Sequence, residues 1–239
     1  MHTLLEPGFV LHHRPYRETS VLLDVFSEKY GRIALVARGV RTSRSRLRPL
    51  LQPFVPLLLS WLGKGELLTM KDVDLFGTAI RLQGDCLLSG LYLNELLMRV
   101  LQKQDPHPWL FGIYHKTLLE LQGPTVNQKA LRLFEKKCLE ELGYGLSFRD
   151  YQSGEPLHPD RLYHFLPDKG FSEQQGEIKN KNTIFTGKSL VAFYEERLED
   201  EASCRDAKRL MRLAISASLG LQSFRSRELF QIERPVCRT

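Results

Sequence analysis

The spacing of apolar positions predicts strands in the first part of the chain and helices in the rest. In residues 1–78, short apolar runs alternate with polar segments and turn residues, a pattern typical of strands. Gly31 suits a turn between two of these runs, because glycine adopts a positive φ at little cost. The runs predict strands over residues 9–11, 21–26, 32–38, 54–61 and 67–70.

A long polar excursion over residues 39–49 indicates what kind of barrel these strands form. Short strands with one such excursion predict a small Greek-key barrel of the OB-fold type. An SH3-like barrel fits the same composition and stays open as an alternative.

From residue 82 onward the apolar period is helical. Side chains three or four positions apart predict helices over residues 87–101, 109–121 and 131–142. Gly143 then stands where a left-handed residue often ends a helix. Residues 144–185 lose this period and predict either an irregular β subdomain or a long loop.

Two further helices are predicted near the C-terminus. Thr186 can cap the first, which extends to Leu198. Ser203, with Asp206 three residues later, resembles a capping box for the second, which should stop at Gly220. The predicted fold is therefore α+β. An OB-fold barrel over residues 1–78 precedes an all-helical domain over residues 79–239, with a small irregular insertion at about 144–185.

Positive charge is concentrated in one segment of the barrel. The chain has a net charge of +6, from 34 basic and 28 acidic residues, yet the segment from Lys29 to Lys64 contains eight basic residues and no acid. A local positive field suits a phosphate backbone, because each cation that meets a phosphate releases a counterion. A solvated loop without a partner is the alternative. The candidate contacts are Lys29, Arg32, Arg38, Arg41, Arg44, Arg46, Arg48 and Lys64.

Two tyrosines and a second basic face extend the candidate nucleic-acid site. Tyr16 and Tyr30 stand at predicted turns beside Arg17 and Lys29, where exposed rings would stack on bases for about 1–3 kcal/mol each. Near the C-terminus, Lys208 and Arg212 are four residues apart and share one helix face. That face either continues the nucleic-acid track, receives an acidic peptide or is only solvated.

Catalytic and metal-binding motifs are weak. Thr186-Gly187-Lys188-Ser189 resembles the end of a P-loop, but Asn182 stands where the motif needs glycine. Asp72 and Asp74 share a strand face and would suit Mg²⁺ in a metal-dependent nuclease, although no third carboxylate is near. The four cysteines are far apart, which predicts neither disulfides nor zinc. We therefore expect no catalytic residue, metal or cofactor.

No apolar run reaches the ~18 residues that a membrane helix needs, and the N-terminus lacks the pattern of a secretory signal. We therefore expect a cytoplasmic protein with no membrane partner.

Several sequence blocks together resemble one family. The blocks follow one another in order over nearly the whole chain, and they begin with Phe9-Val10-Leu11-His12-His13-Arg14-Pro15-Tyr16-Arg17-Glu18-Thr19-Ser20. Together they resemble the bacterial DNA repair protein RecO family. The later blocks include Ala37-Arg38-Gly39-Val40-Arg41, Leu51-Gln52-Pro53-Phe54, Gly90-Leu91-Tyr92-Leu93-Asn94-Glu95-Leu96-Leu97, Leu142-Gly143-Tyr144 and Ser226-Arg227-Glu228-Leu229-Phe230.

The resemblance implies a non-enzymatic recombination mediator associated with the nucleoid. Such proteins bind single- and double-stranded DNA, anneal complementary strands, contact the acidic C-terminal tail of single-stranded DNA-binding protein (SSB), and work with RecR to load RecA. Arg132, in the block Arg132-Leu133-Phe134-Glu135, is our candidate contact for that tail. An RNA-binding or ribosome-associated OB-fold protein is the alternative function.

The chain departs from the family at one point. Many members carry four zinc-binding cysteines after the Leu-Gly-Tyr block, whereas residues 144–185 contain none. We expect ordinary packing to hold this region instead, around Tyr151, Leu157, Leu162, Tyr163, Phe165 and Phe171.

Overall fold

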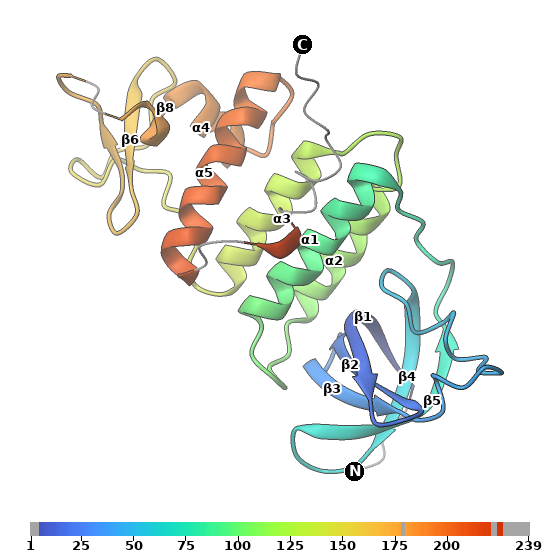
Figure 1. The fold of residues 1–239 in the computed structure, drawn as a ribbon. Helices are drawn as coiled ribbons and strands as arrows, with labels where there is room; N and C mark the ends of the chain where they lie inside the picture. The colour runs from blue at the N-terminus through green and yellow to red at the C-terminus, as the bar shows by residue number, and fades with distance from the viewer. Residues whose placement is uncertain (1–4, 178–179, 221–223, 227–239) are drawn as a thin grey trace. The chain divides into compact units, whose positions relative to one another are not determined.

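The computed structural model describes residues 5–177, 180–220 and 224–226 of the chain. The described residues form two compact units. Unit 1 consists of residues 5–126 and 224–226, and unit 2 consists of residues 127–177 and 180–220. Figure 1 gives the labels of the helices and strands. The expected boundary near residue 78 falls where strands give way to helices, between Leu75 and Gly84.

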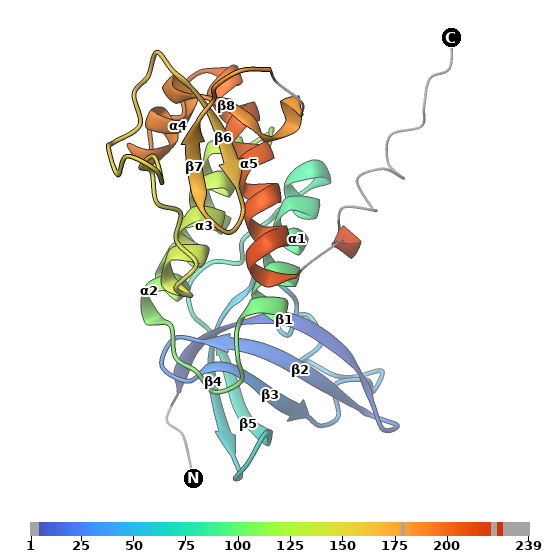
Figure 2. The ribbon, with the colours of Figure 1, turned by 90° about the vertical axis from the view of Figure 1, so that its left-hand side faces the viewer.

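Unit 1 begins with a closed barrel of five strands in the order β1-β2-β3-β5-β4. All neighbouring pairs are antiparallel except β3 and β5, which are parallel. This OB-like barrel confirms the prediction of an N-terminal barrel followed by helices (Figures 1 and 2). Its strands are β1 (Glu6–Tyr16), β2 (Ser20–Ser27), β3 (Gly31–Ala37), β4 (Pro56–Leu62) and β5 (Leu67–Leu75).

The apolar alternation of the strands fills the barrel. Leu23 of β2 stands opposite Leu35 of β3, and Val25 stands opposite Ile33, all four of them buried. Because successive side chains of a strand point to opposite faces, this register directs all four into one core. The turn before β3 uses Gly31 at φ +64°, as the sequence predicted.

Strand β1 is longer than its apolar run predicts. It was expected to end at residue 11, but its ladder with β2 continues to the pair Tyr16 and Ser20. Residues 12–15 are exposed. Main-chain hydrogen bonds continue a strand pair without apolar side chains, so the polar end of β1 gave no signal in the hydrophobic pattern.

Helices α1 (Gly84–Val100) and α2 (Pro108–Glu120) share a core with the barrel. The ring of Phe9 lies edge-on to Tyr114, with centroids 5.2 Å apart. Asn94 of α1 donates from Nδ2 to the carbonyl of Leu11 at 2.9 Å and accepts the Tyr114 hydroxyl at 2.5 Å. Burial raises the pKa of Tyr114, so its hydroxyl keeps its proton and remains a donor.

Unit 2 combines helices with a small sheet of strand order β7-β6-β8 (Figure 2). Of the two alternatives predicted for residues 144–185, a β subdomain or a long loop, the structure has the first, with a three-stranded sheet. A 3-10 turn, Lys181–Thr183, precedes the last strand. The elements are α3 (Gln128–Glu141), β6 (Leu162–Leu166), β7 (Gly170–Glu173), β8 (Ile184–Thr186), α4 (Gly187–Tyr194) and α5 (Glu201–Leu219).

The packing expected for this sheet is correct in part. Leu157, Tyr163, Phe165 and Phe171 are buried, and the rings of Phe165 and Phe171 lie 5.4 Å apart. Tyr151 and Leu162 were expected in the same core but are 43% and 41% exposed. Leu162 alternates with the buried Tyr163 along β6 and so faces solvent.

The helix ends test the predicted caps. Gly143 and Gly220 end α3 and α5 in the left-handed region, and the Thr186 side chain accepts a hydrogen bond from Ser189 N, as predicted. Helix α4 stops at Tyr194, so placing Leu198 in it was wrong. The Ser203 capping box was also wrong, because Asp200 is the N-cap of α5 and accepts from Ser203 N at 2.8 Å.

Candidate nucleic-acid interface

Apolar side chains anchor the connection between β3 and β4 to the barrel. We call residues 38–52 the basic loop. Val40 and Leu51 are buried in the barrel core, and Leu47 and Leu50 are partly buried against it. The main chain adds a hydrogen bond from Arg41 N to Thr19 O at 2.9 Å. The basic loop is therefore fixed at several points along its length.

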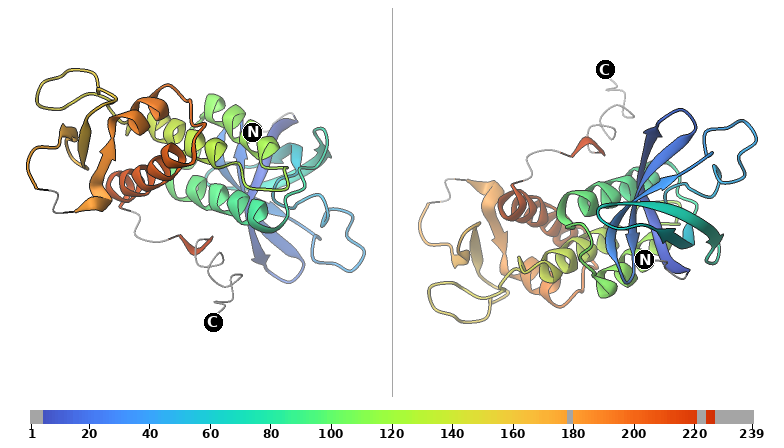
Figure 3. Two further views of the ribbon diagram at one scale, coloured as in Figure 1. Left: turned by 90° about the horizontal axis from the view of Figure 1, so that it is seen from above. Right: turned by 90° about the horizontal axis from the view of Figure 1, so that it is seen from below.

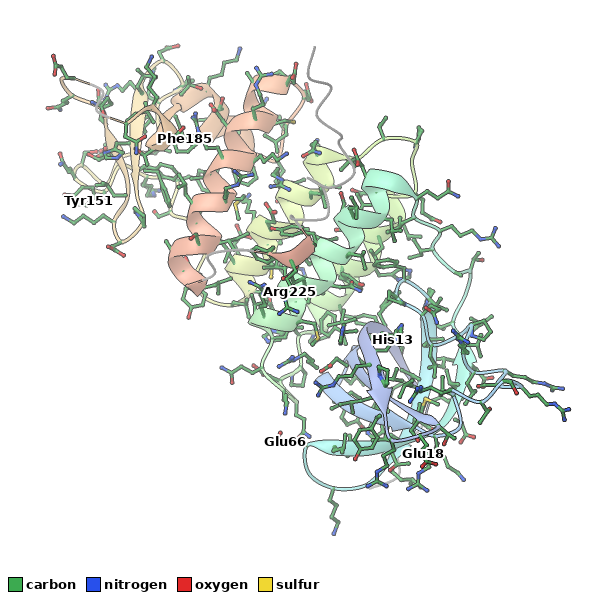
Figure 4. All side chains as sticks on the ribbon, viewed as in Figure 1. His13, Glu18, Glu66, Tyr151, Phe185 and Arg225 are labelled. Carbon is green, nitrogen blue, oxygen red and sulfur yellow. The ribbon has the colours of Figure 1, made fainter. Side chains whose placement is uncertain are left out.

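Between these anchors the arginines of the basic loop face solvent. Arg46 and Arg48 flank Leu47 and are exposed, because the backbone that turns Leu47 inward turns its neighbours outward. Arg41 donates from Nη1 to the carbonyl of Arg17 at 2.9 Å. Within the described residues no ion pair involves Arg38, Arg41, Arg44, Arg46 or Arg48. In Figure 3 this light-blue loop extends beyond the strands, and Figure 4 shows nitrogen-ended side chains that project from it.

The other three candidate cations of the segment differ in how accessible they are. Lys64 is exposed in the turn between β4 and β5. Lys29 is also exposed but forms an ion pair with Glu6 at 3.2 Å. The side chain of Arg32 is only 17% exposed, and its Nη1 lies 4.0 Å from Oδ1 of Asp24. Of the eight candidates, Arg32 has the environment least suited to a phosphate contact.

The two candidate stacking residues are half-buried instead of exposed. The Tyr16 ring carries the guanidinium of Arg17 at 5.3 Å from its centroid, so one face already has a partner. Tyr30 packs against the barrel core, and its ring meets Trp61 edge-on at 5.2 Å. The barrel thus uses much of the apolar surface of both rings.

A cavity of about 310 Å³ lies beside the basic loop. Partial burial lowers the pKa of His13, helped by the neighbouring His12, so its imidazole is mainly neutral at pH 7. Figure 4 labels His13 on the barrel. The hydrophobic pattern gave no signal for His13, because the strand was expected to end at residue 11, and none for Gln52. The cavity is lined by His13, Pro15, Val21, Val40, Arg41, Arg48, Leu51 and Gln52.

Helix α5 of unit 2 presents the second basic set. Lys208 and Arg212 are both exposed, and their spacing of four places them on one face. Arg209 between them turns inward, donating to Ile184 O and to Asp206.

Arg132 lies within a buried charge cluster on α3. Its side chain is 7% exposed, and Nη1 is 2.9 Å from Oε2 of Glu135, whose side chain is fully buried. In the described part of the chain Arg132 Nε has no hydrogen-bond partner. Burial, and secondarily Asp200, raises the pKa of the Cys204 thiol on α5, while the charges of Arg132 and Lys129 oppose the shift. Basic and acidic side chains of α3 and α5 therefore act together on this thiol, and Arg132 itself is paired with Glu135.

The two strand carboxylates do not build a metal centre with other residues. Asp72 accepts the Ser60 hydroxyl at 3.3 Å, and both Asp72 and Asp74 are exposed on β5. Across the described residues there is no group of three or more His, Cys, Asp or Glu side chains that could hold a metal ion. Nor does any helix among them have the length and apolarity to cross a membrane.

This architecture is that of an OB-like barrel protein with a helical C-terminal region. The family model described as recombination protein O N terminal matches residues 1–79, and the model described as recombination protein O C terminal matches residues 81–228. The chain belongs to the recombination protein O family.

Individual relatives are similar over nearly their whole length. The DNA repair protein RecO of Coxiella burnetii (strain RSA 331 / Henzerling II) is 42% identical over 227 residues, which cover 94% of this chain and 97% of that protein. The DNA repair protein RecO of Vibrio cholerae (strain ATCC 39541 / Classical Ogawa 395 / O395) is 42% identical over 228 residues, covering 95% and 93% respectively. Within the class of OB-like barrel proteins, the chain thus belongs to a family whose members include these DNA repair proteins.

Proposed function

We propose that this protein is a non-enzymatic recombination mediator that binds single- and double-stranded DNA and anneals complementary strands. The observation that carries the proposal is the basic loop, where apolar residues hold the backbone on the barrel and the arginines stay exposed. A fixed loop loses little conformational freedom on binding, so more of the electrostatic attraction appears as affinity.

Annealing follows from charge without any base-specific contact. Two DNA strands repel each other through their phosphates, and a cationic surface that neutralises both lowers that repulsion. Contacts to phosphates carry no sequence information, so the activity should tolerate any sequence. If about four phosphates are neutralised, the logarithm of single-strand affinity should fall with the logarithm of salt concentration at a slope of about −3.

The partners of this mediator belong to the same proposal. We infer that it anneals DNA coated by SSB, contacts the acidic tail of SSB near Arg132, and works with RecR to load RecA. Membership of a DNA repair family supports this role.

The test is annealing of two complementary oligonucleotides coated with SSB. The wild-type protein should accelerate annealing, and the triple variant Arg41→Ala, Arg44→Ala, Arg46→Ala should lose most of this effect with little change in thermal stability. A matched control removes three exposed cations elsewhere: Lys116→Ala, Arg197→Ala, Arg205→Ala. Equal losses in the two triple variants, or a salt slope near zero, would contradict the proposal.

RNA is the competing ligand for the same surface, since its phosphates attract the same cations. Competition between single-stranded DNA and structured RNA distinguishes the two. Preferential displacement of DNA by RNA would favour a ribosome-associated role over repair.

A further inference from the structure

The cavity beside the basic loop has features that charge neutralisation does not require. Its floor is apolar, formed by the buried side chains of Val21 at the start of β2 and of Val40 and Leu51 from the loop, and the exposed Pro15 of β1 lies beside them. At about 310 Å³ it lies at the small end of the range of about 300–1,000 Å³ for ligand pockets. This volume suits one small flat group better than a peptide segment.

The rim of the cavity is positive and polar. Arg41 and Arg48 line it together with His13 and Gln52. Arg41 is held by its Nη1 bond to Arg17 O, and Gln52 is oriented by a 2.7 Å bond from its Nε2 to Arg48 O. The neutral His13 imidazole offers one donor and one acceptor to a flat polar edge. An apolar floor, hydrogen-bonding groups and two guanidinium groups at the rim match a nucleobase with its flanking phosphates.

We propose that this cavity receives one unstacked base of a single DNA strand while Arg41 and Arg48 hold the adjacent phosphates. The inference rests on the proposed DNA-binding function. It also explains how the site would distinguish single-stranded DNA from duplex DNA. A base in duplex DNA is paired and stacked, and it enters a pocket only after extrusion, which costs a few kcal/mol. Single strands therefore bind with a contribution that duplex does not receive.

The inference separates experimentally from simple phosphate binding. Two single strands of equal length carry the same phosphates, one with thymine at every position and one built from abasic residues. Wild-type protein should bind the thymine strand about fivefold or more tightly at the same salt concentration, because only that strand can fill the cavity. The two salt slopes should be equal, since the charge contacts are the same.

Variants locate the effect in the cavity. Adjacent strand residues point to opposite faces, so His13→Ala should reduce the preference for the thymine strand, whereas His12→Ala, its exposed neighbour outside the cavity lining, should leave it unchanged. Val40→Phe, which fills the cavity from the buried side, should bring the two strands to nearly equal affinity. Circular dichroism and thermal unfolding verify that each variant keeps its fold.

The outcomes distinguish this inference from the proposed function. Equal wild-type affinity for both strands, with a salt slope near −3, would overturn the base pocket and leave the annealing proposal standing. Loss of salt dependence would instead remove the DNA-binding proposal itself. An acidic peptide that displaces both strands from the wild-type protein, with no preference for thymine, would assign the cavity to a peptide and also overturn the inference.

Discussion

The carboxylate of Glu95 on α1 accepts two hydrogen bonds from Ser226, one from the backbone N–H at 2.8 Å and one from the hydroxyl at 2.7 Å. Arg225 N donates to the same carboxylate at 2.9 Å. Next to them Phe224 is buried against Tyr92, with ring centroids 5.1 Å apart. The chain therefore leaves unit 1 for unit 2 and returns to α1 at residues 224–226, a contact we call the clasp (Arg225 is labelled in Figure 4).

Loss of the Glu95 carboxylate should weaken this clasp. Glu95→Ala removes the acceptor of three hydrogen bonds around a charged group, and we expect it to lower the free energy of unfolding by about 1–3 kcal/mol. Urea unfolding measures the effect. Glu66→Ala, which removes an exposed carboxylate paired with Lys103, is the matched control and should change little. Equal stability of the Glu95 variant and wild type would show that the clasp contributes nothing.

The clasp should also depend on pH in a defined direction. Burial alone would raise the pKa of Glu95, but hydrogen bonds from Ser226 and Arg225 and the charge of Arg99 hold it below its ordinary value. A carboxyl with a lowered pKa stabilises the fold above its unfolded-state pKa, about 4.3. This contribution is lost as the pH falls through the lower folded-state pKa. Unfolding followed between pH 6 and 3 should show the stability difference between wild type and Glu95→Ala disappear in acid.

Asp150 should be a principal stabilising residue of the small sheet in unit 2. Its carboxylate accepts bonds from Gln152 N, Ser153 N, the Ser153 hydroxyl and Glu173 N, at 2.6 to 3.1 Å. These bonds tie the loop that follows Asp150 to β7. Asp150→Ala should lower stability by about 1–3 kcal/mol because it removes the shared acceptor of four hydrogen bonds.

The measurement for Asp150 is local as well as global. Hydrogen exchange at the amides of Ser153 and Glu173 should speed up in Asp150→Ala, whereas Asp160→Ala, with an 88% exposed side chain, should leave both unchanged. Burial would raise the pKa of Asp150, but the backbone bonds hold it below its ordinary value, so the added stability should be lost as the pH falls through the lowered folded-state pKa. Unchanged exchange at both amides would show that packing alone holds the sheet.

Arg32 should differ from the arginines of the basic loop. With its side chain largely buried beside Asp24, Arg32→Ala should change single-strand DNA affinity less than twofold and destabilise the protein by about 1 kcal/mol. Arg46→Ala, at an exposed position, should weaken single-strand DNA affinity by more than twofold and leave stability nearly unchanged. It should also reduce the salt slope by about 0.7. Titrations at several salt concentrations compare the two. A loss of affinity in Arg32→Ala as large as in Arg46→Ala would place Arg32 in the interface.

These contrasts explain what the sequence could and could not predict. The alternation that pairs Leu23 with Leu35 is local, and so are the glycines that end α3 and α5, so the barrel and these two helix ends were predictable. The clasp between Glu95 and Ser226 joins residues 131 positions apart, and no local pattern records such a contact. Exposure of the loop arginines followed from charge alone, but the partial burial of Arg32 depends on tertiary packing that its strand position does not show.

The buried pair of Arg132 and Glu135 requires a careful test of the proposed SSB-tail site. Arg132→Ala would leave the buried Glu135 carboxylate without its cation, so it should lower the free energy of unfolding by about 3–5 kcal/mol. A loss of peptide binding in that variant could then result from unfolding alone. The double variant Arg132→Leu, Glu135→Leu replaces both charges with apolar groups of similar volume, which is often neutral for stability.

That double variant should keep the fold and lose the peptide. If the SSB tail docks near Arg132, an acidic peptide with an apolar C-terminal residue should bind the wild-type protein, because the Arg132 guanidinium attracts its carboxylates. Calorimetric titration should show at least a fivefold weaker affinity in the double variant. Lys169→Ala, which removes an exposed cation before β7, serves as a control for general charge loss. If the double variant binds the peptide as tightly as wild type, the tail docks elsewhere and Arg132 has only a structural role.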